Sequence, residues 1–108
     1  MKKLTREEAI DLFRQQWTDM QKELGDCPSW VERAVYKRKW CETHNFVNCN
    51  NCFLCEWTVQ NNNVPCSECP IDWGYVSCIG GKVDYRYAPI SEILALPERK
   101  VKRKKSKR

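Results

Sequence analysis

The spacing of five cysteines constrains this chain more than any other feature of its sequence. They fall within 27 positions, as two Cys-x-x-Cys pairs, Cys52/Cys55 and Cys66/Cys69, followed by Cys78. Two such pairs, here separated by ten residues, can offer four thiolates to one ion, and Zn²⁺ prefers thiolate sulfur in a closed tetrahedral site. The sequence therefore predicts a structural zinc ion held by Cys52, Cys55, Cys66 and Cys69.

Other cysteines offer alternative ligands. Cys78 lies close behind the second pair, and Cys49 extends the first pair to Cys-x-x-Cys-x-x-Cys. Cys41 and His44 have the spacing of half a second site, but His44 is the only histidine. A disulfide framework and an iron–sulfur cluster are the alternatives to zinc. We expect Cys27, which is isolated in the sequence, to be a small core residue.

A metal ion would compensate for a small core. A domain near 108 residues buries only about 60 to 70% of the surface of its unfolded chain, and a bound metal is a common remedy. Trp57 and Trp73 each follow a Cys-x-x-Cys pair by two to four residues. We expect both indoles to form a hydrophobic shell around the metal.

The N-terminal residues have the signature of an amphipathic helix. Thr5 and Glu8 form a capping-box pattern, and Gly25 is a typical helix stop. Between them, apolar residues recur at steps of three and four, at Ile10, Phe13, Trp17, Met20 and Leu24. The pattern predicts one long helix that ends at Leu24.

A second helix is predicted from Ser29, with Glu32 three residues later, to about Glu42. In this helix the apolar residues would group near one side and the basic residues would face water. The apolar group is Trp30, Val31, Ala34 and Val35, and the basic group is Lys37, Arg38 and Lys39.

The remaining segments predict a small α+β domain over residues 1–98. Residues 43–88 are rich in Asn, Cys, Gly and Pro, which favour turns and short strands. Residues 82–87 alternate like a strand, and a short helix is expected within 89–96, before Pro97. The N-terminal helical segment, 5–42, would pack on this zinc-stapled, turn-rich segment, and residues 99–108 would form a disordered tail.

The tail is strongly basic, whereas the domain before it is acidic. The tail holds eight of the 19 basic residues and none of the 14 acidic ones, so residues 1–98 carry 11 basic and 14 acidic side chains, a net charge of −3. Such a tail can bind nucleic acid in a sequence-independent, salt-sensitive manner. Its cations are Arg99, Lys100, Lys102, Arg103, Lys104, Lys105, Lys107 and Arg108.

Several classes of protein are disfavoured. No stretch approaches eighteen apolar residues, so no membrane span is expected, and no apolar run follows the first three residues as in a signal peptide. We therefore expect an intracellular protein with reduced thiols. No phosphate-binding loop or serine elbow is present, and four thiolates leave zinc no open position for water, so we expect no enzymatic activity.

The cysteine frame resembles a group of small cysteine-rich proteins of bacterial viruses and prophages, mostly of unknown function. The resemblance rests on Cys52-Phe-Leu-Cys55-Glu-Trp57, on Cys66-x-x-Cys69-Pro-Ile-Asp-Trp73 and on Cys78, and it covers about residues 4–96. In that pattern the five cysteines match recurring positions, which makes Cys78 a rival for a place among the four ligands. The resemblance implies a viral origin and the host cytoplasm, without an activity.

These observations together predict a non-enzymatic, zinc-binding phage protein that acts by binding nucleic acid or a nucleoprotein complex. One alternative is a host-directed protein that binds a transcription or defence factor and contains structural zinc. A further alternative is an iron–sulfur redox protein. The sequence leaves the oligomeric state open.

Overall fold

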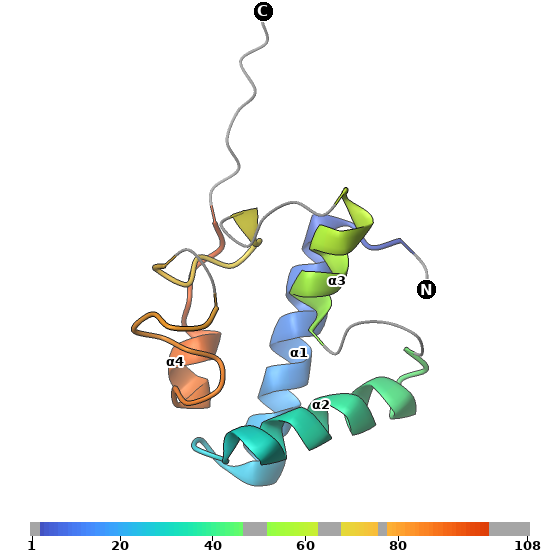
Figure 1. The fold of residues 1–108 in the computed structure, drawn as a ribbon. Coiled ribbons are helices and arrows are strands. Elements are labelled where there is room, and N and C mark those ends of the chain that lie inside the picture. Colours follow the sequence, from blue (N-terminus) through green and yellow to red (C-terminus); the bar gives the residue numbers. More distant parts are fainter. Residues whose placement is uncertain (1–2, 47–51, 63–67, 76–77, 100–108) are drawn as a thin grey trace, which may run out of the picture.

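A computed structural model describes residues 3–46, 52–62, 68–75 and 78–99. These residues form four helices, α1 (Arg6–Leu24), α2 (Trp30–Thr43), α3 (Phe53–Gln60) and α4 (Ile90–Leu94). Helix α1 is central and contacts the other three: α2 crosses its C-terminal end, α3 lies along its N-terminal half, and α4 lies on the other side (Figure 1). The protein is a small, mostly helical domain.

Helix α1 forms as its sequence predicts. The Thr5 side chain accepts a hydrogen bond from the Glu8 amide, and the Glu8 carboxylate accepts one from the Thr5 amide. Gly25 ends the helix with a φ of 86°, a conformation that glycine adopts without steric cost. Ile10 and Phe13 are buried, as are Trp17 and Met20 further along the same face.

Helix α2 has the predicted start but presents the opposite face to the core. Its capping box at Ser29 and Glu32 is confirmed. The expected apolar face is wrong, because Trp30 is 54% exposed and Val31 53% exposed. The buried face instead contains Arg33, Lys37, Trp40 and Cys41.

The contacts of Arg33 and Lys37 explain why this face of α2 is buried. Arg33 donates hydrogen bonds from Nε to the Pro28 carbonyl (3.0 Å) and from Nη1 to the Tyr85 carbonyl (2.8 Å). Lys37 lies against the aromatic rings of Trp17 and Tyr85. Long basic side chains can cover apolar surface with their alkyl stems, so this face packs although its residues are formally polar.

Helix α3 lies in a segment that was expected to contain only turns and short strands. Phe53 and Leu54 are buried, and Trp57 is partly buried one turn after Phe53. Apolar side chains one turn apart lie on one helical face, and this face packs on the N-terminal part of α1. The sequence on both sides of α3 is rich in Asn and Cys, so composition did not indicate this short amphipathic helix.

The core has two parts. One is centred on α1, α4 and the segment around Ile71, and it contains Ile10, Phe13, Trp17, Met20, Leu54, Ile71, Trp73, Ala88, Ile90 and Ile93. The other lies where α2 and α3 meet the start of α1, and it contains Leu4, Ala9, Trp40, Cys41 and Phe53. Both parts include residues of α1, among them Phe13 in the first and Ala9 in the second.

The strand expected over residues 82–87 does not form, because these residues make turns. The Asp84 carboxylate accepts hydrogen bonds from the amides of Gly80 (2.8 Å) and Arg86 (2.9 Å), and it pairs with the Arg86 guanidinium (3.0 Å). A short acidic side chain that binds nearby backbone amides competes with strand pairing. Within the described residues the only β pairing is a single antiparallel bridge between Ile71 and Glu98.

The C-terminal part of the described chain returns to the cysteine-containing segment. The short helix expected within 89–96 is present as α4. Beyond it, the Asp72 amide donates to the Pro97 carbonyl (2.9 Å), and the Arg99 amide donates to the Pro70 carbonyl (2.7 Å). No helix in the described ranges has the length and apolar character needed to cross a membrane.

Candidate metal centre

Four of the described cysteines line one small cavity beside α3, three of them partly buried and one, Cys55, exposed. The cavity has a volume of about 30 Å³, and its wall is completed by one aliphatic, one hydroxyl and one aromatic side chain, Leu54, Thr58 and Trp73. The cysteines are Cys52, Cys55, Cys69 and Cys78. They come from three segments that are well separated in the sequence, so the fold itself gathers them.

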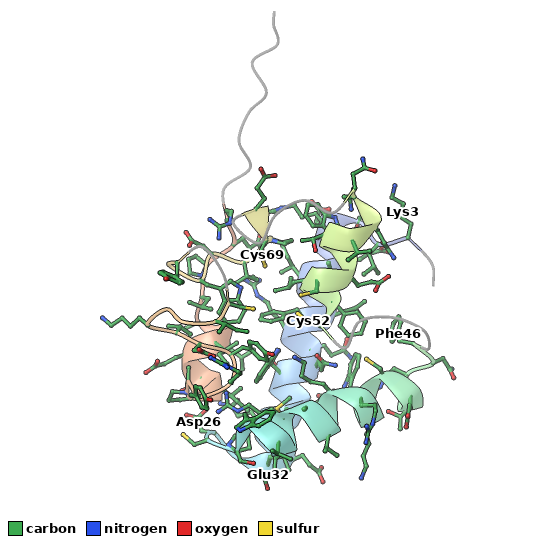
Figure 2. The ribbon with its side chains drawn as sticks, in the orientation of Figure 1. Lys3, Asp26, Glu32, Phe46, Cys52 and Cys69 are labelled. Carbon is green, nitrogen blue, oxygen red and sulfur yellow. The ribbon has the colours of Figure 1, made fainter. Side chains whose placement is uncertain are left out.

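Helix α3 and two loops position these cysteines, and Figure 2 labels Cys52 at the start of α3 and Cys69 in one of the loops. Cys52 is the residue that precedes α3, and Cys55 lies in its first turn. Cys69 is fixed through its backbone carbonyl, which accepts a hydrogen bond from Arg99 Nε at 2.8 Å. The Cys78 carbonyl accepts a hydrogen bond from the Tyr85 amide at 3.1 Å.

The two cysteines at the start of α3 have pKa values shifted in opposite directions. The pKa of Cys52 falls to about 6, mainly because its sulfur accepts a hydrogen bond from the Cys55 thiol. The positive charge of Lys37 and the backbone amides of Leu54 and Cys55 also lower this pKa, whereas burial raises it. The pKa of Cys55 rises well above its ordinary value, because its thiol donates to Cys52 and the negative charge of Cys52 disfavours a second thiolate. Cys52 is therefore the more acidic thiol of this pair.

Cys69 is affected mainly by burial, which raises the pKa of its thiol. The Ile71 amide and the Trp73 indole oppose this effect by interacting favourably with the Cys69 sulfur. Trp73 is 2% exposed, and its Nε1 makes no hydrogen bond of standard geometry to a described residue. A buried N–H group beside sulfur is a donor suited to a thiolate.

The four cysteines surround the cavity but are not drawn together around one point. Among the described residues, no three His, Cys, Asp or Glu side chains are grouped closely enough to hold a metal ion. No disulfide joins any two of the six cysteines within the described ranges. The shared cavity is thus the observation that links these four side chains.

Three of the four predicted ligands, Cys52, Cys55 and Cys69, are among the described residues, and all three line the cavity. The alternate ligand Cys78 lines it with them. The fourth predicted ligand, Cys66, and the other alternate, Cys49, lie outside the described residues. The choice between Cys66 and Cys78 as a ligand therefore stays a prediction.

The pair proposed as half of a second site has other contacts. Cys41 is buried in the core beside Phe53, and Gln16 Nε2 donates to its sulfur at 3.7 Å. The His44 ring stacks on Trp40 with 3.8 Å between ring centroids, and its Nδ1 lies 2.8 Å from the Trp40 carbonyl oxygen. Both side chains thus take part in contacts with α1 or α2, and their role in a second metal site stays a prediction.

Three further expectations need correction. Cys27 is exposed, so it is not a core residue. Trp73 lines the cavity as expected of a hydrophobic shell, whereas Trp57 packs beside Phe53 in the other part of the core. The expectation that Lys37 faces water is wrong, because Lys37 is buried, whereas Arg38 and Lys39 are exposed as expected.

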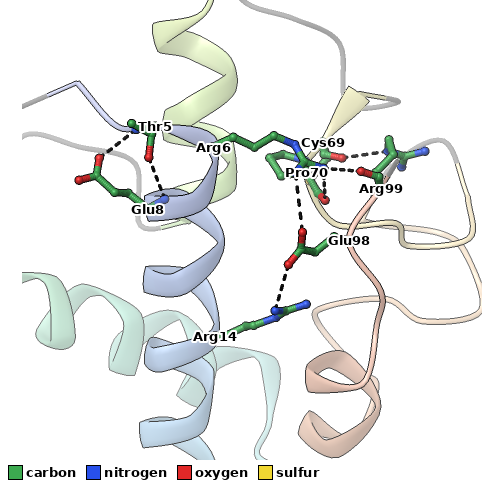
Figure 3. Close-up of polar contacts among 8 residues, drawn as sticks. All are labelled: Thr5, Arg6, Glu8, Arg14, Cys69, Pro70, Glu98 and Arg99. Atoms are coloured by element: carbon green, nitrogen blue, oxygen red, sulfur yellow. Dashed lines mark hydrogen bonds and ion pairs between the residues drawn. The ribbon is translucent and has the colours of Figure 1, made fainter. Parts of the chain in front are cut away.

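The first residue assigned to the basic tail belongs to the folded domain. Arg99 is partly buried, and it binds the carbonyls of Cys69 and Pro70. Its own carbonyl accepts a hydrogen bond from the Arg6 guanidinium of α1 (Figure 3). The other seven cations, Lys100, Lys102, Arg103, Lys104, Lys105, Lys107 and Arg108, lie outside the described residues.

Comparisons with known proteins do not assign the chain to a family. No protein-family model matches the chain, and neither curated proteins nor solved structures gave a significant match. The function proposed below therefore depends on the residues and their arrangement.

Proposed function

We propose that the protein is a non-enzymatic, zinc-stapled domain whose basic tail binds nucleic acid. The observation that carries this proposal is the cavity shared by Cys52, Cys55, Cys69 and Cys78. Four thiolates are a closed ligand set for structural zinc. The sulfurs would move inward from the cavity wall when the ion binds, and binding would join α3 to both cysteine-containing loops.

The cysteine spacing favours zinc over a cluster. Four cysteines can hold either a zinc ion or an iron–sulfur cluster. In the bacterial ferredoxin run, Cys-x₂-Cys-x₂-Cys-x₃-Cys, the last two cysteines are close together, whereas Cys55 and Cys69 are far apart in this sequence. Zinc is therefore proposed in preference to a redox centre.

The tail supplies the proposed contact with nucleic acid. Seven cations in residues 100–108 can neutralise phosphates and release counterions. The tail follows Arg99, whose side chain is bound to the carbonyl of Cys69. The zinc-stapled segment would thus hold the start of the tail at a fixed place on the domain. The resemblance to phage and prophage proteins supports a role in the host cytoplasm during infection.

Metal analysis tests the zinc proposal directly. The protein would be purified under reducing, chelator-free conditions, and zinc would be measured by elemental analysis. Replacement by Co²⁺ would also be followed by visible absorption. We expect about one zinc per chain and absorption bands of a cobalt–thiolate site. A brown protein that contains iron and sulfide would instead support the redox alternative.

A second function is favoured by a separate surface feature. A groove of about 540 Å³ runs between α1 and α2, and it is lined in part by Leu24, Val31, Val35 and Tyr36. Such an apolar groove suits a protein partner, which supports the host-directed alternative. Deletion of residues 100–108 separates the two functions: it removes salt-sensitive nucleic-acid binding under the first and leaves partner binding intact under the second.

A further inference from the structure

A second hollow borders the cysteine cavity. It has a volume of about 290 Å³, and Cys52 and Cys55 line both hollows. Two basic residues of α2, Arg33 and Lys37, lie on its wall with Tyr85. The candidate metal centre therefore has cationic side chains on one side, although the domain as a whole is acidic.

Lys37 is the unusual member of this group because it is buried and forms no ion pair with a carboxylate of the described residues. Its side chain is 6% exposed, and its Nζ lies 4.7 Å from the centroid of the Tyr85 ring and 5.4 Å from that of Trp17. In the described part of the chain, no hydrogen bond or ion pair is made by its ammonium group. A buried charge is costly unless an opposite charge compensates it.

Nearby carboxylates do not serve this purpose. Asp26 acts electrostatically on Arg33, but it accepts hydrogen bonds from the Ser91 amide (2.7 Å) and hydroxyl (2.9 Å). Asp84 also acts on Arg33, but it is paired with Arg86. The proposed ligands Cys52 and Cys55 line the same hollow as Lys37.

The charge of the proposed centre explains this arrangement. Four thiolates and one Zn²⁺ carry a net charge of −2, and a centre of that charge in a partly buried site needs nearby cations. We infer that Lys37 is the counter-charge of the zinc–thiolate centre and that it increases the affinity of that centre for zinc. This inference rests on the proposed function, and it assigns Lys37 a role in metal binding without contact to the metal.

Zinc affinity would be measured by competition with a chromophoric chelator in wild type, Lys37→Met, Lys37→Arg and Lys39→Met. Lys39 is a matched control because it is exposed on the same helix. We expect Lys37→Met to weaken zinc binding about 10- to 100-fold, as substitutions outside the ligand set typically do. Lys37→Arg, which keeps the charge, and Lys39→Met should remain within about threefold of wild type.

The stability of the metal-free proteins distinguishes this role from simple packing. Without metal, Lys37→Met should be at least as stable toward urea as wild type, because a buried charge is replaced by an apolar group of similar length. Lower metal-free stability together with equal losses in Lys37→Met and Lys37→Arg would show a packing role and overturn the inference. Zinc binding by Lys37→Met within about twofold of wild type would also overturn it. Wild-type protein that binds no metal would overturn the proposed function and the inference together.

Discussion

Arg99 Nε donates a 2.8 Å hydrogen bond to the backbone carbonyl of Cys69. The sulfur of the same cysteine lines the cavity of the candidate metal centre. One residue thus connects the proposed metal site to the point where the basic tail leaves the domain. Figure 3 shows that Arg6 completes this junction, since its guanidinium binds the carbonyls of Pro70 and Arg99.

This junction predicts a loss of stability for Arg99→Ala. The substitution removes a charged donor from a partly buried carbonyl, so the free energy of unfolding should fall by about 1 to 2 kcal/mol. Urea denaturation monitored by tryptophan fluorescence would measure it. Lys105→Ala removes the same charge from the tail and should change stability by less than about 0.5 kcal/mol. Equal effects of the two substitutions would show that the junction adds nothing to stability.

The zinc proposal predicts unequal effects for two cysteine substitutions. Cys55→Ser removes a proposed ligand, and structural zinc binding in small domains is worth on the order of 10 kcal/mol of folding free energy. It should therefore destabilise the zinc-loaded protein by at least about 3 kcal/mol. Cys27→Ser, at an exposed cysteine away from the cavity, should have little effect. Thermal unfolding in the presence of zinc compares them, and similar losses would contradict the proposal.

A second pair of cysteine substitutions tests which residue is the fourth ligand. The cavity contains Cys78, so Cys78→Ser should reduce the cobalt–thiolate absorption and lower zinc affinity by at least about 10-fold. Cys66→Ser should retain about one zinc per chain. The opposite result, with Cys66 required and Cys78 dispensable, would restore the set of ligands predicted from the Cys-x-x-Cys spacing.

Asp84 predicts a specific dependence of stability on pH. The Arg86 guanidinium and the amides of Gly80 and Arg86 hold the pKa of Asp84 well below its usual range. A carboxyl group with a lowered folded-state pKa contributes stability above its unfolded pKa, about 3.9, and this contribution is lost as the pH falls toward the folded-state pKa. Asp84→Asn should therefore cost about 1 to 3 kcal/mol at pH 7.

The difference between wild type and Asp84→Asn should shrink as the pH is lowered from about 5 to 3. Urea denaturation across this range, performed on metal-free protein, measures the difference without interference from metal release. Asp11→Asn, at an exposed position of α1, is the control. A difference that stays constant with pH would show that the Asp84 carboxylate does not contribute through its charge.

Local signals predicted the ends of α1 and the start of α2, but not the packing of α2. Capping boxes at Thr5 and Ser29 are local, and each is present in the structure. The buried face of α2 was not predictable from the pattern of apolar residues, because Lys37 is held by rings from two other segments, Trp17 and Tyr85.

Local sequence patterns were also insufficient to predict which residues meet at the candidate site. Cys52 and Cys55, which the Cys-x-x-Cys spacing pairs, line the same cavity. The spacing could not show that the loop containing Cys78 returns to α3, because that contact depends on tertiary structure. The strand expected around Asp84 failed for a related reason, since its side chain binds backbone amides that a strand would pair.

Helix α3 provides a matched pair that tests the second part of the core. Phe53 is fully buried and forms edge-to-face contacts with Trp40 (5.6 Å) and Phe46 (5.0 Å between ring centroids), whereas Val59 on the same helix is 51% exposed. Phe53→Ala should lower the free energy of unfolding by about 3 to 5 kcal/mol, because it removes buried aromatic contacts and leaves a cavity. Val59→Ala should change it by less than about 0.5 kcal/mol. Equilibrium urea unfolding followed by circular dichroism measures both, and a loss below about 1 kcal/mol for Phe53→Ala would mean that α3 does not pack on α1 and α2 as the structure shows.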